Sequence, residues 1–207
     1  LLGSAICVLD LETARSADDC RHCWKEEKVC GQRGDYAALR LGHTFEKIGW
    51  NNKPALGLSI GCWWDYRDSR MHWFDGHTLE ETVGGFVETQ PLLVSFNGIS
   101  FDFVLMRDLL RQHAERIRLN DVPSGHEART LDHAADRAAV LVDLCDAFKI
   151  LCATSYDILA EIWKVDPGRK FESGLNSLDV ISQANGFGAK AMTGAIAPRL
   201  WQQGRYA

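Results

Sequence analysis

The chain has 207 residues, of which 46% are hydrophobic and 25% charged, and its formal net charge is −5. This composition is typical of one globular domain, and no apolar run is long enough for a membrane-spanning helix. A negative net charge excludes a protein that grips nucleic acid with an overall basic surface, but it suits nucleases whose carboxylates hold divalent cations. The first residues also lack the basic flank of a signal peptide. We expect a cytoplasmic protein without membrane contacts.

Apolar patterns and turn residues predict the elements of the first half. The short apolar run Ala5–Leu11 is rich in β-formers and predicts a buried strand. Residues 14–53 break this pattern with charges, glycines and closely spaced cysteines, which is typical of an irregular insertion. Two strand-like runs at 56–66 and 70–76 predict a hairpin, and a helix fits 78–89.

The second half begins with a strand at 91–98 that ends in an Asn-Gly turn, and Ser100 is a suitable N-cap for the helix that follows. Residues 115–137 are polar and predict an irregular loop. The apolar tract 138–163 mixes strand and helix, and a last helix is expected at 177–185. This order predicts a single α/β domain built in three layers.

Two carboxylates near the start carry the first chemical signal. Asp10 and Glu12 stand at i and i+2 of the predicted strand, so their side chains point to the same face of the sheet. Aligned carboxylates repel each other unless a cation lies between them, and hard oxygen ligands suit Mg²⁺ or Mn²⁺. The alternative is an ordinary solvated strand end.

The second signal is the segment 93–102, with the sequence LVSFNGISFD. It predicts a strand, a tight turn, and Asp102 in the first turn of a helix. Alone, an acid in this position is explained by the helix dipole, which favours a negative charge at any helix N-terminus.

Together, the early D-x-E and the later N-G-x-x-F-D resemble the first two motifs of the acidic-tetrad (DEDD) 3′→5′ exonucleases. The resemblance implies the ribonuclease H-like fold of that family, with a mixed central β-sheet flanked by helices. It also implies that Asp10, Glu12 and Asp102 are ligands of two Mg²⁺ or Mn²⁺ ions. By the same resemblance, Asn97 and Phe101 would shape the second motif.

The family's further features concern the substrate and a third motif. Thr13 would lie beside the terminal nucleotide. The segments 156–159, 174–179 and 197–201 also resemble the stretch between the second and third motifs of proofreading-type members. In the family, a Tyr or His then precedes a final Asp, so the domain 1–207 is expected to be incomplete at its C-terminus. Other acids in this stretch lack that context, and we expect Asp157 and Asp179 to cap or orient helices.

The seven cysteines of the chain fall into two groups. Cys20, Cys23 and Cys30 follow a C-x2-C-x6-C spacing inside the insertion, which suits a structural zinc with His43 or His22 as the fourth ligand. The alternative is a set of unligated thiols. The other four lie in apolar segments and are expected to be small core residues, namely Cys7, Cys62, Cys145 and Cys152.

Three functions fit these residues. The favoured one is an exonuclease that hydrolyses phosphodiester bonds at the 3′ end of single-stranded DNA or RNA by a two-metal mechanism. The second is a catalytically silent ribonuclease H-like module that binds nucleic acid or protein. The third is an endonuclease or integrase on the same fold, although Thr13 and the N-G-x-x-F-D motif favour the exonuclease.

Overall fold

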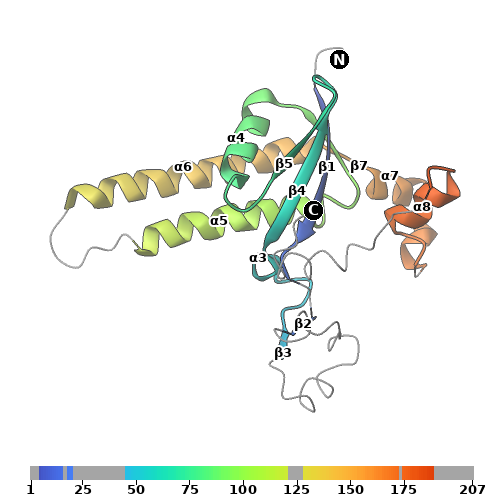
Figure 1. The fold of residues 1–207 in the computed structure, drawn as a ribbon, viewed down its shortest axis with the longest axis horizontal. Coiled ribbons are helices and arrows are strands. Elements are labelled where there is room, and N and C mark those ends of the chain that lie inside the picture. The colour runs from blue at the N-terminus through green and yellow to red at the C-terminus, as the bar shows by residue number, and fades with distance from the viewer. Residues whose placement is uncertain (1–4, 16–17, 21–44, 121–127, 173, 189–207) are drawn as a thin grey trace.

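The computed structural model describes residues 5–15, 18–20, 45–120, 128–172 and 174–188. Its main sheet has five strands in the order β5-β4-β1-β6-β7 (Figure 1). The strands are β1 (Ile6–Thr13), β4 (Leu58–Asp65), β5 (Arg70–Phe74), β6 (Leu92–Ser95) and β7 (Tyr156–Asp157). Antiparallel pairing joins β5 to β4 and β4 to β1, whereas β1, β6 and β7 are parallel. The expected α/β fold with a mixed sheet is therefore confirmed.

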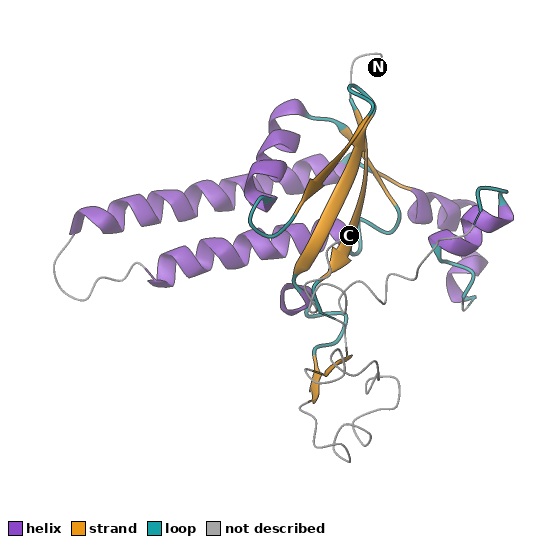
Figure 2. Cartoon of the chain, in the orientation of Figure 1, coloured by secondary structure: helices purple, strands orange, loops and turns teal. Residues whose placement is uncertain are grey.

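Six α-helices accompany this sheet in the described residues (Figure 2). They are α3 (Lys53–Leu56), α4 (Leu79–Thr89), α5 (Asp102–Asn120), α6 (Ala128–Ala153), α7 (Ile158–Val165) and α8 (Leu178–Ala184). A 3₁₀ helix, η2 (Pro167–Phe171), follows α7. None of the described helices is long and apolar enough to cross a bilayer.

The hydrophobic core lies between one face of the sheet and three helices. Cys7, Leu9 and Leu11 alternate along β1 toward this core, which they share with residues of α4, α5 and α6. The opposite face of the sheet exposes large hydrophobic side chains, namely Ile6, Val8, Ile60, Leu92 and Tyr156. The strand predicted at Ala5–Leu11 is thus buried on one face only.

Close packing on the core face requires one glycine. Gly61 of β4 pairs with Leu11 of β1, beneath the ring of Phe74. An added Cβ would lie 2.2 Å from Phe74 Cζ and 2.6 Å from Leu11 Cδ2, so a larger residue would displace both core side chains.

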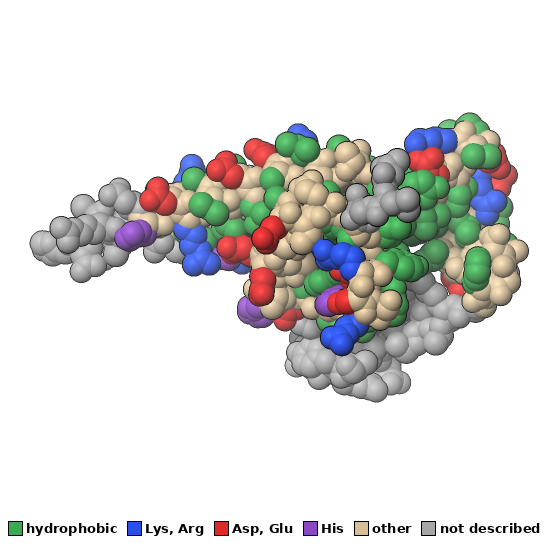
Figure 3. All heavy atoms as spheres, turned by 90° about the horizontal axis from the view of Figure 1, so that it is seen from above, with side chains coloured by type: hydrophobic (Ala, Val, Ile, Leu, Met, Phe, Trp, Pro, Cys, Tyr) green, Lys and Arg blue, Asp and Glu red, His purple; other side chains and the backbone are tan. Residues whose placement is uncertain are grey.

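The helices α5 and α6 correct the loop that was predicted at 115–137. The helix α5 continues to Asn120 and α6 already begins at Ala128. These helix ends are polar because they extend past the sheet (Figure 1), so their sequence lacks the apolar repeat of a core-facing helix. Local pairs stabilise them instead, such as the ion pair between Arg118 and Glu115. On the face shown in Figure 3, acidic and basic side chains are interspersed rather than gathered into separate patches.

The remaining predictions have mixed outcomes, since α5 begins at Asp102 and the residue before it is Phe101 rather than the expected cap Ser100. The hairpin is confirmed as β4 and β5, and the helix at 78–89 as α4. Ser177 caps α8, with its hydroxyl accepting a hydrogen bond from Val180 N at 3.2 Å. In the insertion, β2 (Asp18–Cys20) pairs antiparallel with β3 (Phe45–Lys47), and residues 21–44 lie outside the described part.

Candidate active site at the end of β1

Asp10 and Glu12 lie on the face of β1 that points away from the core. They pair with Cys62 and Ile60 of β4, and the Ser59 hydroxyl donates to the Glu12 carbonyl at 2.9 Å. The strand β6 pairs with β1 only from Ile6 to Val8, so it does not continue alongside these acids. Asp10 is exposed and Glu12 half-buried, which leaves the Asp10 carboxylate accessible to a ligand.

A tight turn connects β6 to α5 and sets the position of Asp102. Asn97 has a left-handed backbone with φ of 67°, a conformation that asparagine tolerates better than most residues. Its carbonyl accepts from Phe101 N at 3.0 Å, and the Gly98 carbonyl accepts from Phe103 N at 2.9 Å. A Cβ on Gly98 would lie 2.2 Å from the Ser95 Oγ, so glycine is required for this turn.

Asp102 is the first residue of α5 and is buried, with 5% of its surface exposed. Burial raises the pKa of Asp102 to about 8, and the negative charge of Asp10 is the next largest cause. The charges of Asp157 and Glu12 raise this pKa further. The structure therefore brings Asp10, Glu12 and Asp102 into one electrostatic group, which we call the acidic cluster.

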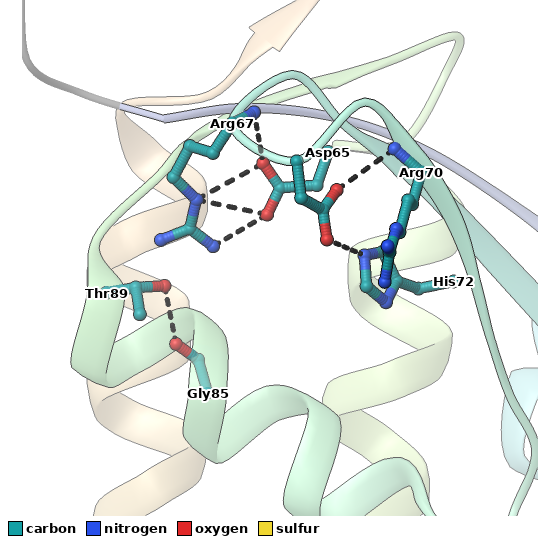
Figure 4. A network of polar contacts seen from close by, with 7 residues as sticks. Asp65, Arg67, Arg70, His72, Gly85 and Thr89 are labelled. Carbon is teal, nitrogen blue, oxygen red and sulfur yellow. Dashed lines mark hydrogen bonds and ion pairs between the residues drawn. The ribbon is translucent and has the colours of Figure 1, made fainter.

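A separate acidic group at the β4–β5 turn has different chemistry. Within the described residues, one set of three side chains has all its ligand atoms within 4.8 Å of one another, and it consists of Asp65, Asp68 and His72. Figure 4 shows that the Arg67 guanidinium faces the Asp65 carboxylate, with Nη2 2.6 Å from Oδ2. This hydrogen bond holds the pKa of Asp65 below its ordinary value. The group therefore stabilises a turn by ion pairing.

The carboxylate oxygens of the acidic cluster are farther apart than the ligand atoms of this turn group, because they do not all lie within 4.8 Å of one another. Ligands of a two-ion site are distributed over two centres roughly 4 Å apart, so they need not all lie within contact of one another. Mutual repulsion of carboxylates also disfavours close approach without a cation. A divalent cation between these side chains would relieve the repulsion that raises the pKa of Asp102.

Asp157 supports the second motif from the neighbouring strand. Its carboxylate accepts hydrogen bonds from Asn97 N and Ile99 N, both at 3.0 Å, and also caps α7 by accepting from Leu159 N and Ala160 N. The expected capping role of Asp157 is confirmed, whereas its contact with the turn was not predicted. Because its oxygens are occupied by four backbone amides, Asp157 is not available as a fourth metal ligand.

The other candidate residues differ in accessibility. Thr13 is nearly buried, which leaves little of its side chain for a nucleotide, whereas Asn97 and Phe101 are half-buried beside Asp102. Of the cysteines expected in the core, Cys7 and Cys145 are buried, and Cys62 and Cys152 are half-buried. The zinc prediction falls on Cys20, whose side chain is not described, and on three residues outside the described part, namely Cys23, Cys30 and His43.

No protein-family model, curated protein or solved structure matches this chain. The chemistry of the site therefore has to be argued from its residues and their geometry alone.

Proposed function

We propose that the chain is the metal-binding core of a 3′→5′ exonuclease with a ribonuclease H-like fold, acting on single-stranded DNA or RNA. The observation that carries the proposal is the buried Asp102 carboxyl, whose pKa is raised first by burial and next by the negative charge of Asp10, with smaller contributions from Asp157 and Glu12. Three carboxylates from a strand and a helix N-terminus provide the oxygen ligands that Mg²⁺ or Mn²⁺ prefers. The mixed sheet in the order β5-β4-β1-β6-β7 supports the fold assignment.

Each side chain of the acidic cluster has a distinct part in this proposal. Asp102 is fixed by the turn at 97–101 and by burial, so it would hold an ion in a set position. Asp10 is exposed and Glu12 half-buried, and both would supply further carboxylate ligands. The bound ions would activate a water molecule and stabilise the leaving oxygen of the phosphodiester.

A hydrolysis assay on the purified natural protein tests the proposal. With Mn²⁺, a 5′-labelled single strand should shorten stepwise from its 3′ end, and Asp10→Asn should reduce the rate by roughly a thousandfold or more because the ions lose a shared ligand. The matched control is Asp68→Asn, which removes a carboxylate of the turn group and should retain the activity. Internal cuts, or an undiminished rate in Asp10→Asn, would contradict the proposal.

A second candidate is a catalytically silent module of the same fold. Two observations favour it: the exposed hydrophobic face formed by Ile6, Val8, Ile60 and Leu92, and the occupation of Asp157 by backbone amides. A silent module would bind a strand or a protein without shortening the strand. The same assay distinguishes the two functions, because binding without hydrolysis would select the module.

A further inference from the structure

An exposed tryptophan stands next to the second motif. Trp50 is 63% exposed, and its ring centroid lies 5.9 Å from that of Phe101 with an angle of 66° between the planes. This is an edge-to-face contact, which orients an aromatic ring without covering both of its faces. The described residues offer no hydrogen-bond acceptor to the indole N–H, so polar bonding does not explain the position of this side chain.

The segment that carries Trp50 is attached to both motifs. Phe101 directly precedes Asp102, and α3, which begins three residues after Trp50, packs against α5. On the other side, Ala14 N donates to the Gly57 carbonyl at 3.2 Å and Arg15 N to the Leu56 carbonyl at 2.9 Å. The segment that carries Trp50 is thus joined through the end of α3 to the chain that follows Glu12, and through α3 to α5, the helix that begins with Asp102.

A positive charge accompanies the two rings. Lys53 Nζ lies 6.0 Å from the centroid of the Phe101 ring, at the outer limit of a cation–π contact. No acidic residue in the described part of the chain forms an ion pair with Lys53. Two aromatic rings and a cation therefore meet at Phe101, the residue that directly precedes the buried Asp102.

We propose that Trp50 and Phe101 form a stacking platform for an unpaired nucleobase, with Lys53 contacting the adjoining phosphate. This inference rests on the proposed function and deepens it, because it specifies the kind of strand end that the site takes. Aromatic side chains bind any base through its π-face, and a nearby cation adds attraction to the backbone. A base inside a duplex already stacks on its neighbours, so the platform selects ends whose last base is free.

Equilibrium binding tests the platform without hydrolysis. The probe is a 5′-labelled single-stranded oligodeoxynucleotide, measured by fluorescence anisotropy with Ca²⁺, whose 3′-terminal nucleotide either carries its base or is abasic. Trp50→Ala should weaken binding of the base-bearing strand roughly 5- to 150-fold, the range that loss of one stacked base corresponds to. It should leave binding of the abasic strand unchanged, and Trp50→Phe should restore most of the difference.

Controls separate this inference from the proposed function. Trp73→Ala removes another exposed tryptophan, on β5, and should leave both affinities unchanged. Equal affinity of the natural protein for the two strands, or an equal loss for both in Trp50→Ala, would overturn the platform alone. Failure of the natural protein to bind any single strand would overturn both the platform and the proposed function.

Discussion

Replacing Asp102 with asparagine should remove a large part of the pH dependence of stability in the metal-free protein. Because the folded-state pKa of about 8 lies above the ordinary value of 3.8, the folded chain keeps a proton that the unfolded chain loses. This contribution to stability is fully present below pH 3.8 and is lost as the pH rises through 8. On going from pH 5 to pH 9, the free energy of unfolding should therefore fall by roughly 4 kcal/mol more in the natural protein than in Asp102→Asn.

Urea unfolding with a chelator at pH 5, 7 and 9 measures this difference. The free energy of unfolding should fall more steeply with pH in the natural protein than in Asp102→Asn. The control is Asp108→Asn, the same change on the same helix at a carboxyl that is 28% exposed, and its curve should follow the natural protein. Parallel curves for the natural protein and Asp102→Asn would mean that burial and the neighbouring carboxylates do not raise the pKa of Asp102.

Replacing Asp157 with alanine should destabilise the protein by roughly 3–5 kcal/mol. The change leaves four backbone N–H groups without their acceptor and removes the N-cap of α7. Asp157→Asn keeps one carbonyl oxygen and should cost about half as much. Hydrogen exchange in both variants should accelerate first at Asn97 and Ile99, because their amides lose a buried partner.

Asp166 offers a matched comparison for this effect. It also caps a helix, η2, but it is exposed and its side chain accepts only from Arg169 N, at 3.3 Å, within the described residues. Asp166→Ala should therefore cost no more than roughly 1 kcal/mol. If Asp157→Ala were as mild as Asp166→Ala, the contact between Asp157 and the turn would not be what holds the second motif.

The elements that sequence could predict are those with local signals. The hairpin of β4 and β5 and the helices α4 and α8 all depend on patterns within about ten residues. The length of α5 and α6 was missed because their outer ends do not face the core and carry no apolar repeat. The burial of β1 on one face only was also missed, since an apolar run does not reveal which face a partner covers.

The acidic cluster could be predicted only in part. Asp10 and Glu12 share a face because of strand periodicity, but their nearness to Asp102 depends on the parallel pairing of β1 with β6. Asp157 and Trp50 were not assigned to the site, because each lies more than 45 residues from the turn residues it contacts. A single carboxylate or tryptophan carries no local signal for such contacts.

Binding of Mn²⁺ to the purified natural protein tests the acidic cluster most directly. Calorimetry or electron paramagnetic resonance near pH 7.5 should detect bound Mn²⁺. Asp10→Asn or Asp102→Asn should weaken the affinity for Mn²⁺ by at least roughly 100-fold, because losing a residue that only hydrogen-bonds to a metal ligand already lowers metal affinity by roughly 10- to 100-fold. Asp68→Asn should bind Mn²⁺ as the natural protein does. Binding that survives Asp10→Asn and Asp102→Asn but is lost in Asp68→Asn would place the cation at the β4–β5 turn and contradict the assignment.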